Sequence, residues 1–283
     1  MLRCGPQLNG ALGEGNVADT AMSGSVSDSG TTATTGAAGA LALKTAVWRL
    51  RSRGCWSDAA ALLENLPGPG PALRRTSLLV ERCLFTDDGW AEAEDSLRTA
   101  EALARDDDER GAAACERGHL AYAATLLNVR DRADEARSAL GRAAALLAPA
   151  AAGRPLLDFR RGLIAEHIAD SPQSARAAYR RSHAGATAHN DPLLLSFTWH
   201  HLAGLALREG ELAEARHGFT QSLRIREELG YLVGTAPALV ALAQTEPEEE
   251  AARLRAEAER LFRLLGGVPA WMAERPAPSV EPA

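Results

Sequence analysis

The sequence predicts an all-α fold, a right-handed α-solenoid of about six antiparallel helix hairpins, and three observations support this prediction. Apolar residues recur at helical spacing from Leu41 onward. Alanine, the strongest helix former, accounts for 58 of the 283 residues, whereas only 13 residues are aromatic. Similar helix pairs carry an alanine at Ala136, Ala175 and Ala215, which gives spacings of 39 and 40 residues. A fixed period of this size is typical of stacked helical hairpins.

The three clearest helix pairs share one pattern of small and large residues. The first helix offers a large residue followed by small ones, and the second helix offers an alanine four positions before a large residue. The small residues let the helices approach closely, and burying the large residue fully contributes about 1.5–3 kcal/mol. The residues of this repeat signature are Leu120, Ala123, Ala136 and Leu140, then Phe159, Gly162, Ala175 and Tyr179, and finally Trp199, Leu202, Ala203, Ala215 and Phe219.

Start and stop signals divide residues 41–267 into twelve expected helices. The Pro-Gly run 67–71 separates the first two pairs, because proline lacks the N–H that a helix interior needs. Pro237 leaves the start of one helix open, since it marks either a later start or a kink. The flanking segments 1–40 and 268–283 are expected to be disordered, because they hold too few large apolar residues to offset ordering entropy. The expected pairs are 41–53 with 56–66, 72–86 with 89–105, 109–129 with 131–148, 155–169 with 171–188, 192–209 with 211–229, and 232–245 with 247–266.

The repeat signature resembles that of the tetratricopeptide repeat family, W-x2-L-G-x2-Y…A-x3-F…P. The resemblance is clearest over residues 115–229 and weaker over 41–105 and 230–266; the closing proline is absent, and the period exceeds the usual 34 residues. The longer repeats are similar to the tetratricopeptide regions of actinobacterial transcription regulators, as is the segment from Arg226 to Gly230. The resemblance implies a solenoid whose concave face binds partners.

Charge and cysteine content narrow the class of protein. The net charge is −6, with acidic and basic residues interspersed, so a general attraction to nucleic acid is not expected. Of the 31 basic residues only Lys44 is a lysine. The four cysteines have no CxxC spacing, which favours a reducing, cytoplasmic location. No run of about 18 apolar residues predicts a membrane span.

No arrangement of residues indicates an enzyme, a cofactor or a metal. His200 and His201 are adjacent and point to different helix faces, and Glu166-His167 lacks the second histidine four residues away that a zinc hydrolase helix carries. The acidic run 106–109 lacks the alternating ligands of a calcium loop and reads instead as a helix start favoured by the macrodipole. An unrecognised all-helical enzyme remains a third, weakly supported alternative.

The resemblance implies that the first helix of each hairpin lines the concave groove. Carried over residue by residue, it places Asn128, Arg160, His167, His200 and Arg208 at exposed groove positions. Arginine grips carboxylates bidentately, so a basic groove suits an acidic or C-terminal carboxylate-bearing segment. Binding is then expected to be salt-sensitive and to strengthen toward pH 6 as the histidines gain charge. The alternative is an ordinary solvated face.

The sequence therefore predicts a non-enzymatic, cytoplasmic scaffold that binds a protein or peptide partner, with no nucleic acid and no membrane involved. The alternative is a ligand- or peptide-sensing module of a bacterial regulatory system. Both functions use the same groove.

Overall fold

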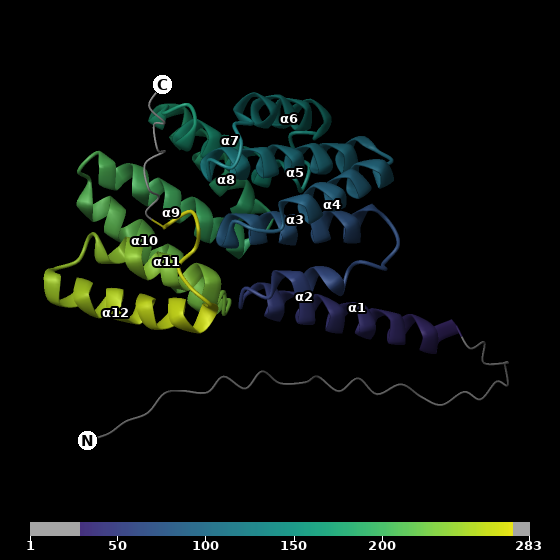
Figure 1. The fold of residues 1–283 in the computed structure, drawn as a ribbon, viewed down its shortest axis with the longest axis horizontal. Coiled ribbons are helices and arrows are strands. Elements are labelled where there is room, and N and C mark those ends of the chain that lie inside the picture. Colours follow the sequence, from purple (N-terminus) through teal and green to yellow (C-terminus); the bar gives the residue numbers. More distant parts are fainter. Residues whose placement is uncertain (1–28, 274–283) are drawn as a thin grey trace, which may run out of the picture. The chain divides into compact units, whose positions relative to one another are not determined.

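The computed structural model describes residues 29–273, and within these limits the chain is all helical, without a strand (Figure 1). The expected disorder of residues 1–28 and 274–283 lies outside the described residues. The helices are α1 (Ser29–Arg51), α2 (Trp56–Ala61), α3 (Pro69–Thr86), α4 (Trp90–Leu103), α5 (Asp107–Leu126), α6 (Ala133–Leu146), α7 (Arg154–His167), α8 (Pro172–Ala188), α9 (Pro192–Arg208), α10 (Leu212–Glu228), α11 (Leu232–Ala243) and α12 (Glu248–Leu265).

The twelve described helices correspond one to one with those expected, and their packing in consecutive pairs confirms an all-α solenoid. Four helices begin earlier than expected, α5 and α7 by only one or two residues and α1 and α3 by more. Helix α1 begins at Ser29 rather than near residue 41, so the expected disorder is wrong for residues 29–40. Extending an existing helix through Ala- and Thr-containing sequence is easier than starting one. Helix α3 begins at Pro69, inside the Pro-Gly run: Gly68 has φ +97°, and proline is well suited to the first helical position.

The chain divides into two units, Met1–Leu41 and Ala42–Ala283, and the contacts described below belong to the second. Its core contains most of the repeat signature. Eleven of the thirteen signature residues are buried, while Trp199 and Leu202 are half-buried. Gly162 shows why a small residue is needed, since a Cβ there would lie only 2.4 Å from the Tyr179 ring. The expected helix-to-helix packing is confirmed at these positions.

The start of α5 and the interior of α11 settle two points that the sequence raises. Asp106 caps α5 by accepting a hydrogen bond from the N–H of Glu109 at 2.8 Å, and Glu109 accepts one from the N–H of Arg105, the residue before the cap, at 2.7 Å. The acidic run 106–109 is therefore a helix start. Pro237 lies inside α11, which begins before it, so the helix does not start late.

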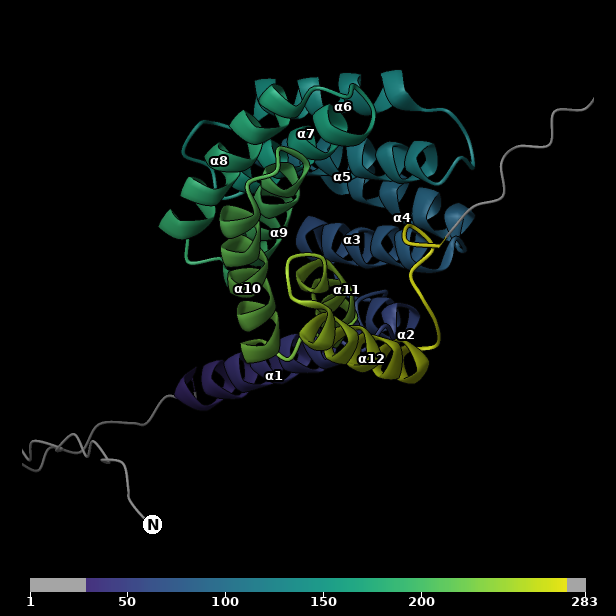
Figure 2. The same ribbon diagram turned by 90° about the vertical axis from the view of Figure 1, so that its left-hand side faces the viewer.

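Residues from the first and last hairpins of the second unit are in direct contact. The N–H of Val233 donates to the carbonyl of Ser52 at 3.1 Å, and Trp48 stacks on Tyr231 with ring centroids 5.7 Å apart. Trp48 Nε1 also donates to the carbonyl of Leu229 at 3.2 Å. Figure 2 shows α11 and α12 beside α2 and α3. The repeat array therefore closes on itself.

The segment after α12 also takes part in this contact. The N–H of Ala270 donates to the carbonyl of Phe85 at 2.9 Å, and Trp271 packs edge-on against the Phe85 ring. The expectation of disorder from residue 268 is therefore wrong for residues 268–273. Backbone pairing and an aromatic contact hold this stretch against α3, although its proline content resembles that of a disordered tail.

None of the helices in the described part of the chain is both long and apolar enough to cross a lipid bilayer.

Candidate functional site

A cavity of about 680 Å³ lies on the side of the second unit formed mainly by α3, α5, α7, α9 and α11, with two residues contributed by α10. Its wall is mainly apolar and aromatic, and a few charged groups face it. This composition is typical of small-ligand and peptide sites, whose volumes run from about 300 to 1,000 Å³. The apolar lining residues include Leu84, Phe85, Tyr122, Leu126, Leu156, Phe159, Leu163, Leu193, Leu194, Phe197, Leu207, Phe219, Tyr231, Val233 and Pro237.

Arg160 of α7 is buried in the cavity wall, where it is paired with a carboxylate. Its Nη2 donates to Glu116 at 2.8 Å, and its Nη1 donates to the sulfur of Cys115 at 3.2 Å. Arg160 is 3% exposed, and Glu116 is 6% exposed. Burial raises the pKa of Glu116, while the Arg160 charge opposes that rise. The pair links α5 to α7, and its charges neutralise each other.

Arg226 of α10 lines the same cavity but has no carboxylate within ion-pair distance among the described residues. Its Nη1 donates to the carbonyl of Gly234 at 2.7 Å, its Nε to the hydroxyl of Ser196 at 3.4 Å, and its guanidinium lies over the Phe197 ring. Arg226 is 4% exposed, and burial lowers its pKa to about 10. It therefore stays charged at neutral pH, with only neutral acceptors around it.

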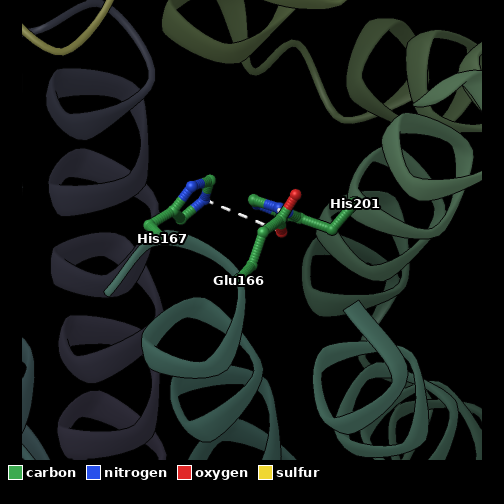
Figure 3. Close-up of side chains that lie close together, drawn as sticks. All are labelled: Glu166, His167 and His201. Carbon is green, nitrogen blue, oxygen red and sulfur yellow. Dashed lines mark hydrogen bonds and ion pairs between the residues drawn. The ribbon is translucent and has the colours of Figure 1, made fainter. Parts of the chain in front are cut away.

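Glu166, near the end of α7, is the centre of a polar cluster on the cavity wall (Figure 3). Its Oε2 accepts from Tyr179 at 2.6 Å and lies 2.9 Å from Nδ1 of His201, while its Oε1 accepts from Arg208 at 2.7 Å. The Nε2 of His167 lies 3.7 Å from the same Oε2. Burial alone would raise the pKa of Glu166, but hydrogen bonds from His201 and Tyr179 lower it to about 2.

The structure brings four of the five predicted groove residues to the cavity: Arg160, His167, His200 and Arg208. These residues were expected to be exposed, and only some of them are. Arg160 is buried, and Arg208 is exposed but paired with Glu166. The predicted free basic groove is therefore already neutralised at both arginines.

Asn128 does not line the cavity. It follows α5 with φ +52°, a left-handed conformation that asparagine tolerates better than most residues, and it is exposed. Asp87, Asp170 and Asn190 adopt the same conformation near other helix ends. The position of Asn128 is explained by helix termination.

The expected strengthening of binding toward pH 6 does not agree with the surroundings of the two histidines. Burial lowers the pKa of His167 to about 4, and the neighbouring His201 charge lowers it further. Burial likewise lowers the pKa of His200 well below its ordinary value, and Arg226 adds to this shift. Both side chains are therefore neutral at pH 6.

The sequence did not reveal four of the residues that determine the site: Glu116, Glu166, His201 and Arg226. Each of these residues contacts side chains or backbone from another helix. Contacts between residues far apart in the sequence leave no periodic pattern in a single sequence. His200 and His201 both line the cavity, and it is His201 that contacts Glu166 of α7. Arg226 belongs to a second helix, whereas the resemblance pointed only to first helices.

Comparison with solved structures shows the same kind of fold. The crystal structure of BtubC (BKLC) from P. vanneervenii is similar at 15% sequence identity and a TM-score of 0.51, over 82% of this chain and 96% of BtubC. A second similar structure is a signal transduction ATPase with numerous domains and a tetratricopeptide repeat sensor, from Pyrococcus horikoshii. It has 15% identity and a TM-score of 0.48, over 75% of this chain and 34% of that protein. At this identity the likeness concerns the fold alone. No protein-family model matches the sequence, and no curated protein is significantly similar to it.

Proposed function

We propose that this chain is a non-enzymatic, tetratricopeptide-repeat-like binding module that holds a carboxylate-bearing segment of a protein or peptide partner in its cavity. The observation that carries the proposal is Arg226. A buried charge without a partner of opposite sign is costly, and a ligand carboxylate would relieve that cost. Arginine is also the residue best suited to bind a carboxylate with two parallel hydrogen bonds.

The rest of the cavity suits the apolar part of such a ligand. Phe197 lies directly under the Arg226 guanidinium, and Phe159 stacks on Phe197 at 5.8 Å, so aromatic surface continues from the charge across α9 to α7. Apolar side chains next to a terminal carboxylate can bury against this surface, at roughly 25 cal/mol per Å². We therefore propose a short amphipathic segment as the occupant.

The proposed anchor differs from the one expected from the sequence. Arg160 and Arg208 already have carboxylate partners, and removing Arg160 would leave Glu116 buried without a counter-charge. Breaking a buried pair in this way destabilises a protein by about 3–5 kcal/mol. Arg160→Ala would thus report on folding rather than on binding.

A second function, sensing of a small carboxylate-bearing molecule, is favoured by the closure of the array. The contact of Ser52 with Val233 joins the first and last hairpins, and the contact of Phe85 with Ala270 joins α3 to the segment after α12. A closed array limits the length of chain that can enter, whereas a free small molecule needs no such length.

The test compares short peptides with a free C-terminus against the same peptides with an amidated C-terminus. Fluorescence polarisation would be measured with a labelled pool of five-residue peptides whose last two residues are apolar. We expect the free acids to bind at least tenfold more tightly than the amides. Arg226→Met should abolish this preference, whereas Arg224→Met, on the exposed face of the same helix, should preserve it.

Equal binding of acids and amides, or an unchanged preference in Arg226→Met, would rule out the proposed anchor. The melting temperature distinguishes a binding role of Arg226 from a purely structural one. Because the substitution removes a buried charge that has no carboxylate partner, we expect the Tm of Arg226→Met to be at least that of the wild type. Thermal shifts with small carboxylic acids, in the absence of any peptide binding, would favour the sensing function.

A further inference from the structure

Two imidazoles and one carboxylate converge on the cavity wall at the junction of α7 and α9. Their ligand atoms, Oε2 of Glu166, Nε2 of His167 and Nδ1 of His201, all lie within 4.8 Å of one another. Figure 3 shows the three side chains pointing toward a common point. A tetrahedral zinc site places its ligand atoms about 3.3 Å apart, given metal–ligand bonds of about 2.0–2.2 Å. The observed separations from Oε2, 2.9 Å to His201 and 3.7 Å to His167, lie on either side of that value.

We propose that Glu166, His167 and His201 form a binding site for a divalent transition metal of the zinc type. Nitrogen and oxygen donors together favour this class over Mg²⁺ and Ca²⁺, which prefer oxygen ligands alone. Three protein ligands leave a fourth position open toward the cavity, as in zinc sites that hold an exchangeable water or a ligand atom. The proposal does not depend on the function proposed above.

Surrounding side chains hold the three ligands in place. The His201 ring stacks on Tyr179 at 4.9 Å and meets Phe159 edge-on at 5.3 Å, which fixes its orientation. Arg208 occupies Oε1 of Glu166 and leaves Oε2 directed at the histidines. Hydrogen bonding to a ligating carboxylate is the usual support for a metal ligand. The metal would replace the hydrogen bond between Oε2 and His201.

The donor atoms and the accessibility of the cluster also suit a cation. One carboxylate and two imidazoles offer the lone pairs that a metal needs. The His167 side chain is 30% exposed and the His201 side chain 20% exposed, and both line the cavity. A metal ion can therefore enter from the cavity without unfolding the helices.

The experiment is a titration of tag-free protein with Zn²⁺ by isothermal calorimetry, and with Co²⁺ by absorption spectroscopy. We expect one Zn²⁺ per chain, a rise in Tm on Zn²⁺ addition, and Co²⁺ bands typical of a low-coordinate site. His167→Ala and His201→Ala should each weaken Zn²⁺ binding at least tenfold. The control is His217→Ala on α10, an exposed histidine outside the cluster, which should bind Zn²⁺ as the wild type does.

The partly exposed position of His167 makes His167→Ala the variant that best preserves the fold, and circular dichroism would verify it. Absence of stoichiometric Zn²⁺ binding in the wild type would overturn the proposal. So would binding that His167→Ala and His201→Ala leave unchanged, or that is lost equally in His217→Ala.

Discussion

The arginines of the cavity wall carry the same charge but differ in what neutralises it. Arg160 is paired with Glu116, and Arg208 is paired with Glu166, whereas Arg226 has only neutral acceptors. Residue type alone made Arg160 and Arg208 the better candidates for binding an anion. The structure makes Arg226 the better candidate instead, because an arginine already paired with a carboxylate attracts a second carboxylate only weakly.

His119, in the same wall, gives a pH-dependence at the residue scale. Burial lowers its pKa well below the ordinary value, and the nearby Arg160 charge adds to this shift. The unfolded chain gains a proton at this histidine below about pH 6.5, while the folded chain does not. The unfolded state then binds more protons, so stability falls as pH decreases from about 6.5, by about 1.4 kcal/mol per pH unit for this group.

Replacing this histidine should remove its share of the acid sensitivity. We expect His119→Leu to lose less stability than the wild type between pH 7 and pH 5, as measured by urea unfolding at each pH. At pH 8 neither state binds a proton there, so the difference between the two proteins at that pH reports packing alone. Parallel pH profiles for the two proteins would mean that His119 is not held neutral by burial.

At the scale of the element, each hairpin depends on small residues where its helices meet. Gly162 lies under the Tyr179 ring. Gly218 faces the buried Ala203 of the neighbouring helix, and a Cβ added at Gly218 would lie only 2.8 Å from the Cβ of Ala203. Alanine and glycine at these positions allow a close approach between helices and thus full burial of the large residues beside them.

Helix α10 offers a matched pair of positions for testing this packing. Ala215 is fully buried, whereas Ala213 is exposed two residues earlier. Ala215→Glu should destabilise the fold by about 3 kcal/mol or more, because it buries a charge that has no partner. Ala213→Glu should change the free energy of unfolding by less than about 0.5 kcal/mol. Denaturant unfolding of both variants measures the difference; similar losses would show that the helix register is wrong.

At the scale of the whole second unit, closure couples residues that are far apart in the sequence. Trp48 and Tyr231 stack although they are separated by most of the repeat array. In an open solenoid each repeat would contact only its neighbours, and such residues would not influence each other. The closed array encloses the cavity that both proposals concern.

A double-mutant cycle on this stacked pair tests the closure. Trp48→Leu and Tyr231→Leu should show a coupling energy of about 0.5–1.5 kcal/mol in urea unfolding, as expected for an aromatic pair in contact. Trp48→Leu combined with Trp199→Leu is the control. Trp199 contacts His183 and His217 instead, so these two substitutions should be additive. Additivity in both cycles would argue that the array is open.

The sequence by itself determined the class of fold and nearly every helix boundary. Helical periodicity, proline and glycine punctuation, and the 39- and 40-residue alanine spacing are local or short-range signals, and each repeat is formed by residues close together in the chain. For the same reason the sequence indicated that the repeat signature forms the core, whereas the placement of the first helices along the groove came from the resemblance to tetratricopeptide repeats.

Only the tertiary structure decided which side chains meet across the repeats. The pairs Arg160 with Glu116 and Glu166 with His201 join different hairpins, and the contact of Ser52 with Val233 joins the two ends of the array. A shift of one position along a helix turns a side chain by about 100°, so His201 contacts Glu166 of α7 while the adjacent His200 contacts Phe219 of α10. Such pairings depend on the rotation and approach of whole helices, which the spacing of residues along one chain does not specify.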